Sequence, residues 1–122
     1  MGLDQYILKK IEDDEYEYMQ LIQWRKRNQI HGYFDKILDG VENCEIYSVT
    51  IDQLEELSNI CQKVLDNPDL AEELLPHMPG IFFGNYEYED FYFKQVRESK
   101  EDIDELIEND DGKTQYYYYG WW

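Results

Sequence analysis

The segment at residues 24–34, WRKRNQIHGYF, contains the side chains of this sequence that are best suited to chemistry. If residues 24–38 form a helix, a rotation of about 100° per residue places one stripe of side chains beside the apolar face, with His31 one turn before Asp35. An imidazole oriented by a carboxylate is the arrangement that a general base needs, and it titrates near neutral pH. The stripe consists of Trp24, Asn28, His31 and Asp35.

A small enzyme is therefore one interpretation, with a pocket formed by Arg27, Asn28, His31 and Asp35. No serine or cysteine nucleophile can be placed beside His31 from spacing alone, and a catalytic site needs several convergent roles. A His and an Asp four residues apart also occur on ordinary helices, where they form a hydrogen-bonded border. We favour the structural interpretation and expect no catalytic residues.

Arg25, Lys26 and Arg27 form the one concentrated basic run of this segment. They could hold a phosphate, but no glycine-rich loop is present to bring backbone N–H groups to it. Pairing with the chain's own carboxylates is the better explanation. We therefore predict internal neutralisation at the start of a helix.

The remaining His and Cys residues suggest no site. His77 lies between two residues of a loop-like segment, and Cys44 and Cys61 show neither a CxxC pattern nor a disulfide framework. We expect both thiols to be reduced and packed in the core. The calcium-loop pattern of an EF-hand is absent, so we predict no metal and no cofactor.

Charge is the strongest signal in the composition, because 28 acidic and 11 basic residues give a net charge of -17. Such a chain is repelled by nucleic acid and by anionic membranes and is attracted to basic partners. With 43% hydrophobic and 16% aromatic residues, it should nevertheless fold, as a single domain over residues 1–122. No apolar run approaches a membrane span, and no signal peptide is evident, so we expect a soluble intracellular protein.

The first half of the chain predicts a small sheet and one helix. Residues 3–11 favour a strand, and residues 16–22 fit either a second strand or a helix that continues into Trp24. An apolar stripe at helical spacing predicts a helix over residues 25–38. Residues 46–49 form a brief extended stretch.

The second half predicts helices and a final strand. Thr50 and Gln53 form a capping box before a helix that reaches Leu65, and Asn67 followed by Pro68 predicts a short helix. GIFFG at residues 80–84 suggests a buried turn or strand. We expect Asn85 to cap a helix that ends at Glu108.

The tail TQYYYYGWW is rich in β-forming residues, and residues 115–119 should pair with the N-terminal strand. The alternative is a free tail. The whole pattern predicts an α+β fold, with three to four helices packed on a small antiparallel sheet formed by the N-terminal strand or strands and the C-terminal tail.

Several acidic residues of the last predicted helix share one face that is about 15 Å long. A nucleic-acid strand carries one phosphate per roughly 3.4 Å, so this line of carboxylates could mimic it in part. Tyrosines nearby would add contact surface. The alternative is a solvated helix face. The candidate partner-binding residues are Glu98, Glu101, Asp102, Glu105, Glu108, Tyr86 and Tyr88.

Three motifs, MGLDQY, WRKRNQIH and GIFFGNYEYEDFY, resemble those of a group of small proteins encoded by bacteriophages and prophages. The resemblance covers roughly residues 1–108 and carries over no catalytic residues. It implies a phage accessory protein that acts on a host protein in the host cytoplasm.

Charge and resemblance together suggest an anti-CRISPR-like inhibitor, which binds a basic host protein of a nucleic-acid-handling or defence complex. We expect neither direct nucleic-acid binding nor membrane binding. Besides the small enzyme, a phage structural or assembly component remains an alternative, with the aromatic tail as the edge of a homo-oligomer.

Overall fold

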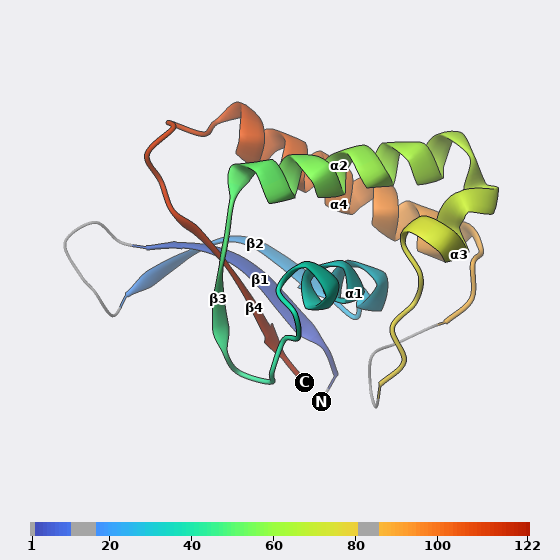
Figure 1. Ribbon diagram of the computed structural model, residues 1–122, viewed down its shortest axis with the longest axis horizontal. Helices are drawn as coiled ribbons and strands as arrows, with labels where there is room; N and C mark the ends of the chain where they lie inside the picture. The colour runs from blue at the N-terminus through green and yellow to red at the C-terminus, as the bar shows by residue number, and fades with distance from the viewer. Residues whose placement is uncertain (1, 11–16, 81–85) are drawn as a thin grey trace.

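A computed structural model describes residues 2–10, 17–80 and 86–122, which form an α+β fold with four α-helices and a four-stranded antiparallel sheet (Figure 1). This confirms the predicted fold class. The elements in chain order are β1 (Asp4–Lys10), β2 (Tyr18–Arg25), α1 (Asn28–Ile37), β3 (Ile46–Val49), α2 (Ile51–Asp66), the 3-10 helix η1 (Pro68–Leu70), α3 (Ala71–Leu74), α4 (Asp90–Glu108) and β4 (Tyr116–Trp121).

The sheet has the strand order β2-β1-β4-β3, and every neighbouring pair is antiparallel. The predicted pairing of the tail with the first strand is confirmed, since Ile7 of β1 lies opposite Tyr118 of β4. The strand β4 is also paired with β3 on its other side. Its backbone is therefore occupied on both sides, and β4 offers no free strand edge to a second copy.

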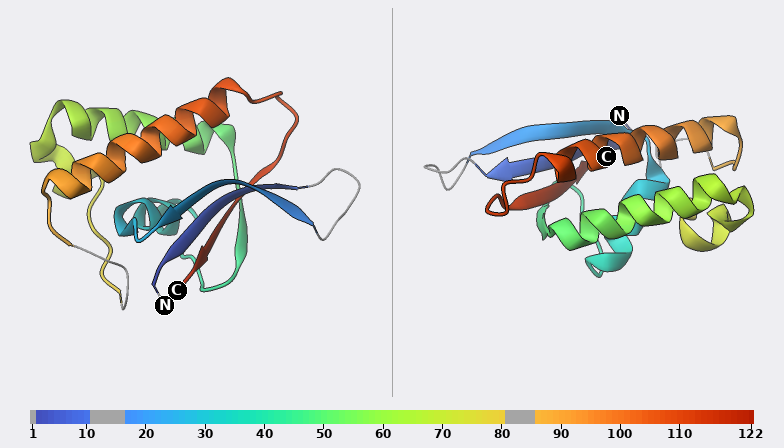
Figure 2. Two further views of the ribbon diagram at one scale, coloured as in Figure 1. Left: turned by 180° about the vertical axis from the view of Figure 1, so that it is seen from behind. Right: turned by 90° about the horizontal axis from the view of Figure 1, so that it is seen from above.

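One face of the sheet packs against the helices. Ile7, Ile22 and Tyr118 point to this face and are buried, together with Ile30 and Phe34 of α1. The rings of Phe34 and Tyr118 stack with centroids 4.1 Å apart. In Figure 2, α1 and α2 lie on the same side of the strands. The core therefore lies between one sheet face and the helical layer.

The helix α2 begins as the sequence predicts. Thr50 accepts a hydrogen bond from the backbone N–H of Gln53, and the Gln53 side chain accepts one from the backbone N–H of Thr50. Asn67 similarly caps the short helix that starts at Pro68. These local signals need no tertiary information, which is why the sequence reveals them.

The prediction of a helix starting at Trp24 or Arg25 is wrong. Both residues end β2, and the alternation of buried Ile22 and Trp24 matches the inner face of a strand. Lys26 then turns the chain at a φ of 55°, and its N–H donates to the carbonyl of Leu3. The helix α1 starts only at Asn28.

The prediction that Asn85 caps the last helix, which would then start at residue 86, is also wrong. The helix α4 begins at Asp90, while residues 86–88 have no regular secondary structure. Asn85 and residues 81–84 lie outside the described residues. Tyr88 instead accepts a hydrogen bond from the backbone N–H of His77, a long-range contact that spacing does not reveal. The predicted end at Glu108 is confirmed.

Cys61 is buried, as expected, and burial raises the pKa of its thiol to about 12. Cys44 is exposed, so its predicted place in the core is wrong. It lies at a φ of 67° in the turn before β3, where its N–H donates to the carbonyl of Gly120. Both thiols are free, as predicted.

Candidate functional site

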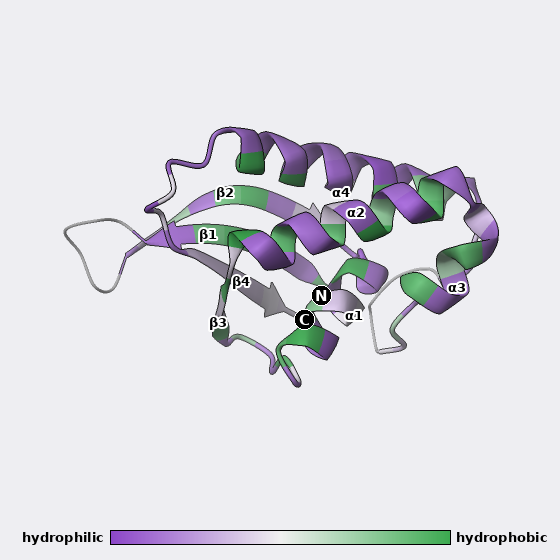
Figure 3. Ribbon diagram, turned by 45° about the horizontal axis from the view of Figure 1, so that its top comes forward, coloured by the Kyte–Doolittle hydropathy of each residue, from purple (hydrophilic) through white to green (hydrophobic). Residues whose placement is uncertain are grey.

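The acidic residues nominated on α4 share one long face of the helix, and Figure 3 shows that the outward surface of α4 is hydrophilic along most of its length. Glu101, Glu105 and Glu108 are exposed to solvent. Glu98 and Asp102 are only partly exposed, because they turn toward β2. The acidic face therefore divides into a solvent-facing set and a set that contacts the protein itself.

Asp102 and Glu98 have internal partners. The indole N–H of Trp24 donates to Asp102 at 2.9 Å, which fixes the end of β2 beneath α4. A carboxylate oxygen of Glu98 lies 3.9 Å from the guanidinium of Arg27. These two acids still contribute negative charge, but part of their bonding capacity is already used.

Arg27 is enclosed between β2 and α4. Its Nη1 donates to the hydroxyl of Ser99 at 2.7 Å, and its guanidinium carbon lies 5.8 Å from the ring centroid of Trp24. Burial lowers the pKa of Arg27, and Glu98 opposes that effect. Arg25 likewise lies 3.5 Å from Asp4. The predicted internal neutralisation is confirmed for these two arginines.

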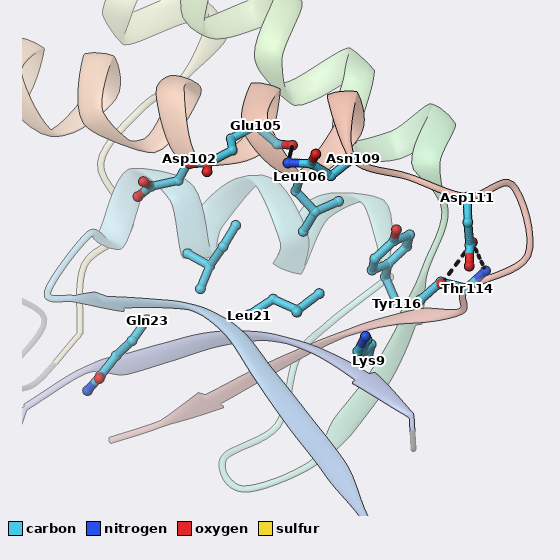
Figure 4. Close-up of a pocket in the computed structure, with 11 residues that line it drawn as sticks. Lys9, Leu21, Gln23, Asp102, Glu105, Leu106, Asn109, Asp111, Thr114 and Tyr116 are labelled. Atoms are coloured by element: carbon cyan, nitrogen blue, oxygen red, sulfur yellow. Dashed lines mark hydrogen bonds between the residues drawn. The ribbon is translucent and has the colours of Figure 1, made fainter. Parts of the chain in front are cut away.

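A groove with a volume of about 500 Å³ lies between α4 and β2, beside the acidic face (Figure 4). Asp102 and Glu105 line it from α4, and Leu21 lines it from β2. The size is that of a typical ligand pocket. A cationic side chain entering here would meet carboxylates above an apolar base. The lining residues are Lys9, Leu21, Ile22, Gln23, Asp102, Glu105, Leu106, Asn109, Asp111, Thr114 and Tyr116.

Asp111 supplies a further negative charge at one end of the groove. Its Oδ1 accepts hydrogen bonds from the backbone N–H groups of Lys113 and Thr114 and from the Thr114 hydroxyl. Donors aimed at the carboxylate favour its charged form and lower the pKa of Asp111 to about 2. Asp111 is therefore ionised throughout the physiological range.

The alternative pocket around His31 has a different geometry from the one expected. His31 is fully buried, and its Nδ1 lies 2.7 Å from the hydroxyl of Tyr118. Burial lowers the pKa of His31 to about 4, so the ring is neutral at pH 7. Gln5 Nε2 donates to the same Tyr118 hydroxyl at 3.2 Å, so that hydroxyl bridges Gln5 and His31.

The other three residues of that pocket point to separate partners. Asn28 accepts a hydrogen bond from the backbone N–H of Met78, and Asp35 accepts one from the backbone N–H of Val41. Arg27 faces α4, as described above. His31 lines neither the α4–β2 groove nor the cavity of about 330 Å³ beside α1, which Asp35 does line.

His77 is a residue whose importance the sequence did not reveal. Its Nδ1 lies 2.8 Å from Asn28 Oδ1, and its Nε2 lies 2.7 Å from the carbonyl oxygen of Glu87. It therefore ties the segment before α4 to the start of α1. Three tyrosine rings surround it with centroids within 6.0 Å, namely Tyr86, Tyr88 and Tyr92.

Tyr86 and Tyr88 consequently belong to the His77 cluster at the beginning of α4. The helix places its first and last residues about 27 Å apart, so this cluster is remote from Glu105 and Glu108. Tyr86 is 44% exposed and can still contact a partner. The two tyrosines do not, however, extend the α4–β2 groove.

Comparison of the chain with protein-family models, with curated proteins and with solved structures finds no match. Within residues 2–10, 17–80 and 86–122, no three His, Cys, Asp or Glu side chains are arranged to hold a metal ion. No helix in the described part of the chain has the length and apolar character that a membrane crossing requires.

Proposed function

We propose that this protein binds a basic partner protein through the exposed carboxylates of α4 and the adjoining groove. The observation that carries the proposal is the arrangement of Glu101, Glu105 and Glu108, which are exposed on one face of α4 beside a groove lined by further acids. Along the helix axis this set spans about 10 Å. A lysine- or arginine-bearing surface would match it in charge.

The physical basis is long-range attraction followed by short-range pairing. A chain with a net charge of -17 accelerates its encounter with a cationic surface, and salt weakens that effect. Exposed carboxylates at the rim of an interface contribute modestly to affinity but strongly to orientation and association rate. The internal partners of Asp102 and Glu98 hold the groove wall in place.

The resemblance to phage and prophage proteins directs the proposal to a host target in the host cytoplasm. In this form the protein is an anti-CRISPR-like inhibitor of a nucleic-acid-handling or defence complex, whose basic surface normally contacts phosphates. The carboxylates of α4 are spaced more widely than phosphates. The mimicry is therefore partial, and inhibition depends on occupying the basic surface.

The burial and the neutral charge of His31 favour a binding function over the enzyme alternative. The His31 imidazole is buried, neutral and hydrogen-bonded to Tyr118, so it does not face a solvent-accessible substrate, whereas the α4 carboxylates face solvent. The alternative of a phage structural or assembly component is also less favoured. It relied on the tail as the edge of an oligomer, but the tail is an inner strand of the sheet.

Capture of partners from bacterial lysate at low and high salt tests the proposal with two matched variants. One variant carries Glu101→Gln, Glu105→Gln and Glu108→Gln. The control carries Glu55→Gln, Glu72→Gln and Glu73→Gln, which are exposed positions on α2 and α3. Each removes three negative charges and changes the net charge from -17 to -14.

At low salt, we expect the unmodified protein and the control to capture a partner that the α4 variant does not capture. Addition of the unmodified protein should then displace labelled nucleic acid from that purified partner. Equal capture by all three proteins, or captured partners with no excess of basic residues, would contradict the proposal.

A further inference from the structure

The sheet has a second face, which is turned away from the core. In an antiparallel sheet with one buried face, the water-facing positions are usually polar. Here Gln5 and Ile7 of β1 point inward, and the outward positions carry Tyr6 and Leu8 between the charged residues Asp4 and Lys10. The large outward residues, called the aromatic face below, are Tyr6, Leu8, Tyr18, Tyr117, Tyr119 and Trp121, and the polar residues Gln20 and Gln23 of β2 lie outward beside them.

The aromatic face is continuous across three strands. Tyr6 lies opposite Tyr119 in the register of β1 and β4, and their ring centroids are 5.8 Å apart. Tyr18 of β2 meets Tyr117 edge to face at 5.2 Å. These contacts pre-order the rings, so little side-chain entropy remains to be lost when a partner binds.

The aromatic face is open to solvent at one side. Trp121 is 50% exposed, and Ile46, which lies opposite Tyr119 on β3, is 40% exposed. Seen from behind, β1 and β4 have no helix of the described chain in front of them (Figure 2, left). Trp121 is exposed and the four tyrosines beside it are partly exposed, and such a grouping of aromatic residues is typical of binding surfaces.

A second copy of the chain is not expected to bind to the aromatic face. Each copy carries a net charge of -17, so two copies repel each other. A segment of a cationic partner is attracted by the same charge.

We propose that the aromatic face binds arginine side chains from an extended segment of a basic partner, an inference that rests on the proposed function for the charge of that partner. The guanidinium group stacks on tyrosine and tryptophan rings, and it does so more readily than the lysine ammonium. The net charge of -17 attracts such a segment to the protein.

Two synthetic peptides test this inference, each with five cationic residues separated by glycine or serine. One contains arginine and the other contains lysine. Binding is followed by calorimetry and by NMR of the tyrosine rings and the Trp121 indole. We expect the arginine peptide to bind at least about fivefold more tightly and to shift the signals of the aromatic face.

Three variants locate the effect. Tyr6→Ser with Tyr119→Ser should remove the preference for arginine, and Tyr6→Phe with Tyr119→Phe should retain it. If the double Ser variant does not fold, Trp121→Gln tests the same face, because the Trp121 side chain is half exposed and its replacement disturbs the core less. It should weaken binding of the arginine peptide by about twofold or more.

The two proposals fail in different ways. One outcome is that the Glu101, Glu105 and Glu108 variant binds neither peptide while the unmodified protein binds the arginine and lysine peptides equally well. That result would support the α4 site and contradict arginine binding by the aromatic face. Preference for arginine that persists in that variant supports the aromatic face independently. A concentration-dependent dimer that buries Trp121 would overturn the proposed occupant.

Discussion

At the scale of single residues, the buried polar groups of this protein are organised to hold the sheet and α1 together. Gln5 is fully buried, and its side chain both accepts from the backbone N–H of Arg27 and donates to the Arg27 carbonyl. It also donates to Tyr118, which in turn contacts His31. These bonds join β1, β4 and the first turn of α1, and burial favours the neutral form of His31 among them.

Acid should therefore destabilise the protein through His31. Its pKa is about 4 in the folded state and about 6.5 in the unfolded state, so the unfolded chain binds the proton first as the pH falls. Between pH 6.5 and pH 4 the free energy of unfolding should decrease by about 3 kcal/mol from this group. Urea titrations of the unmodified protein and of His31→Gln measure the difference, and parallel pH profiles would contradict the prediction.

Gly120 should not tolerate a side chain. A Cβ atom there would lie 3.2 Å from His31 Cε1 and 3.3 Å from a ring atom of Trp122. Because both rings are packed, we expect Gly120→Ala to lower the free energy of unfolding by about 1–3 kcal/mol. In a His31→Ala background the cost should be smaller, and an unchanged cost would show that the two positions do not interact.

At the scale of elements, the capping box of α2 is the clearest local signal that the structure confirms. Removal of the Thr50 hydroxyl leaves the backbone N–H of Gln53 without that acceptor. We expect Thr50→Ala to lower the free energy of unfolding by about 1 kcal/mol, measured by chemical denaturation. Thr50→Ser, which keeps the hydroxyl, should be close to the unmodified protein; equal losses in both variants would assign the effect to the methyl group.

Elements defined by local patterns were predictable, and elements defined by long-range contacts were not. The β-forming residues of the tail and the caps at Thr50 and Asn67 are readable from neighbouring residues. The segment before α4 is held by contacts that His77 makes across ten and eleven residues, and these have no counterpart in periodicity. The end of β2 depends on Trp24, whose indole bonds to an acid far along the chain.

Part of the candidate site was also predictable from the sequence. Spacing alone places the acids of α4 on one face, because residues three and four apart are neighbours on a helix. It does not reveal that Glu98 and Asp102 contact Arg27 and Trp24, since those residues lie on other elements. The groove beside Glu105 also forms only when α4 packs next to β2.

At the scale of the whole molecule, an excess of 17 negative charges remains after the internal pairs are formed. Like charges on a compact surface repel, and added salt screens that repulsion. We expect the free energy of unfolding to rise between low salt and about 0.5 M NaCl, while affinity for a basic partner falls. Calorimetry at several salt concentrations measures both, and a stability that decreases with salt would contradict the first expectation.

The central claim is that the position of the α4 carboxylates, and not net charge alone, determines recognition. The most direct test is the dissociation constant for the captured partner, measured across a range of NaCl concentrations. The claim predicts that replacing Glu101, Glu105 and Glu108 by Gln weakens binding at low salt by about tenfold, since each exposed pair contributes up to about 1 kcal/mol. The control at Glu55, Glu72 and Glu73 should bind as the unmodified protein does, and equal weakening in both variants would contradict the claim.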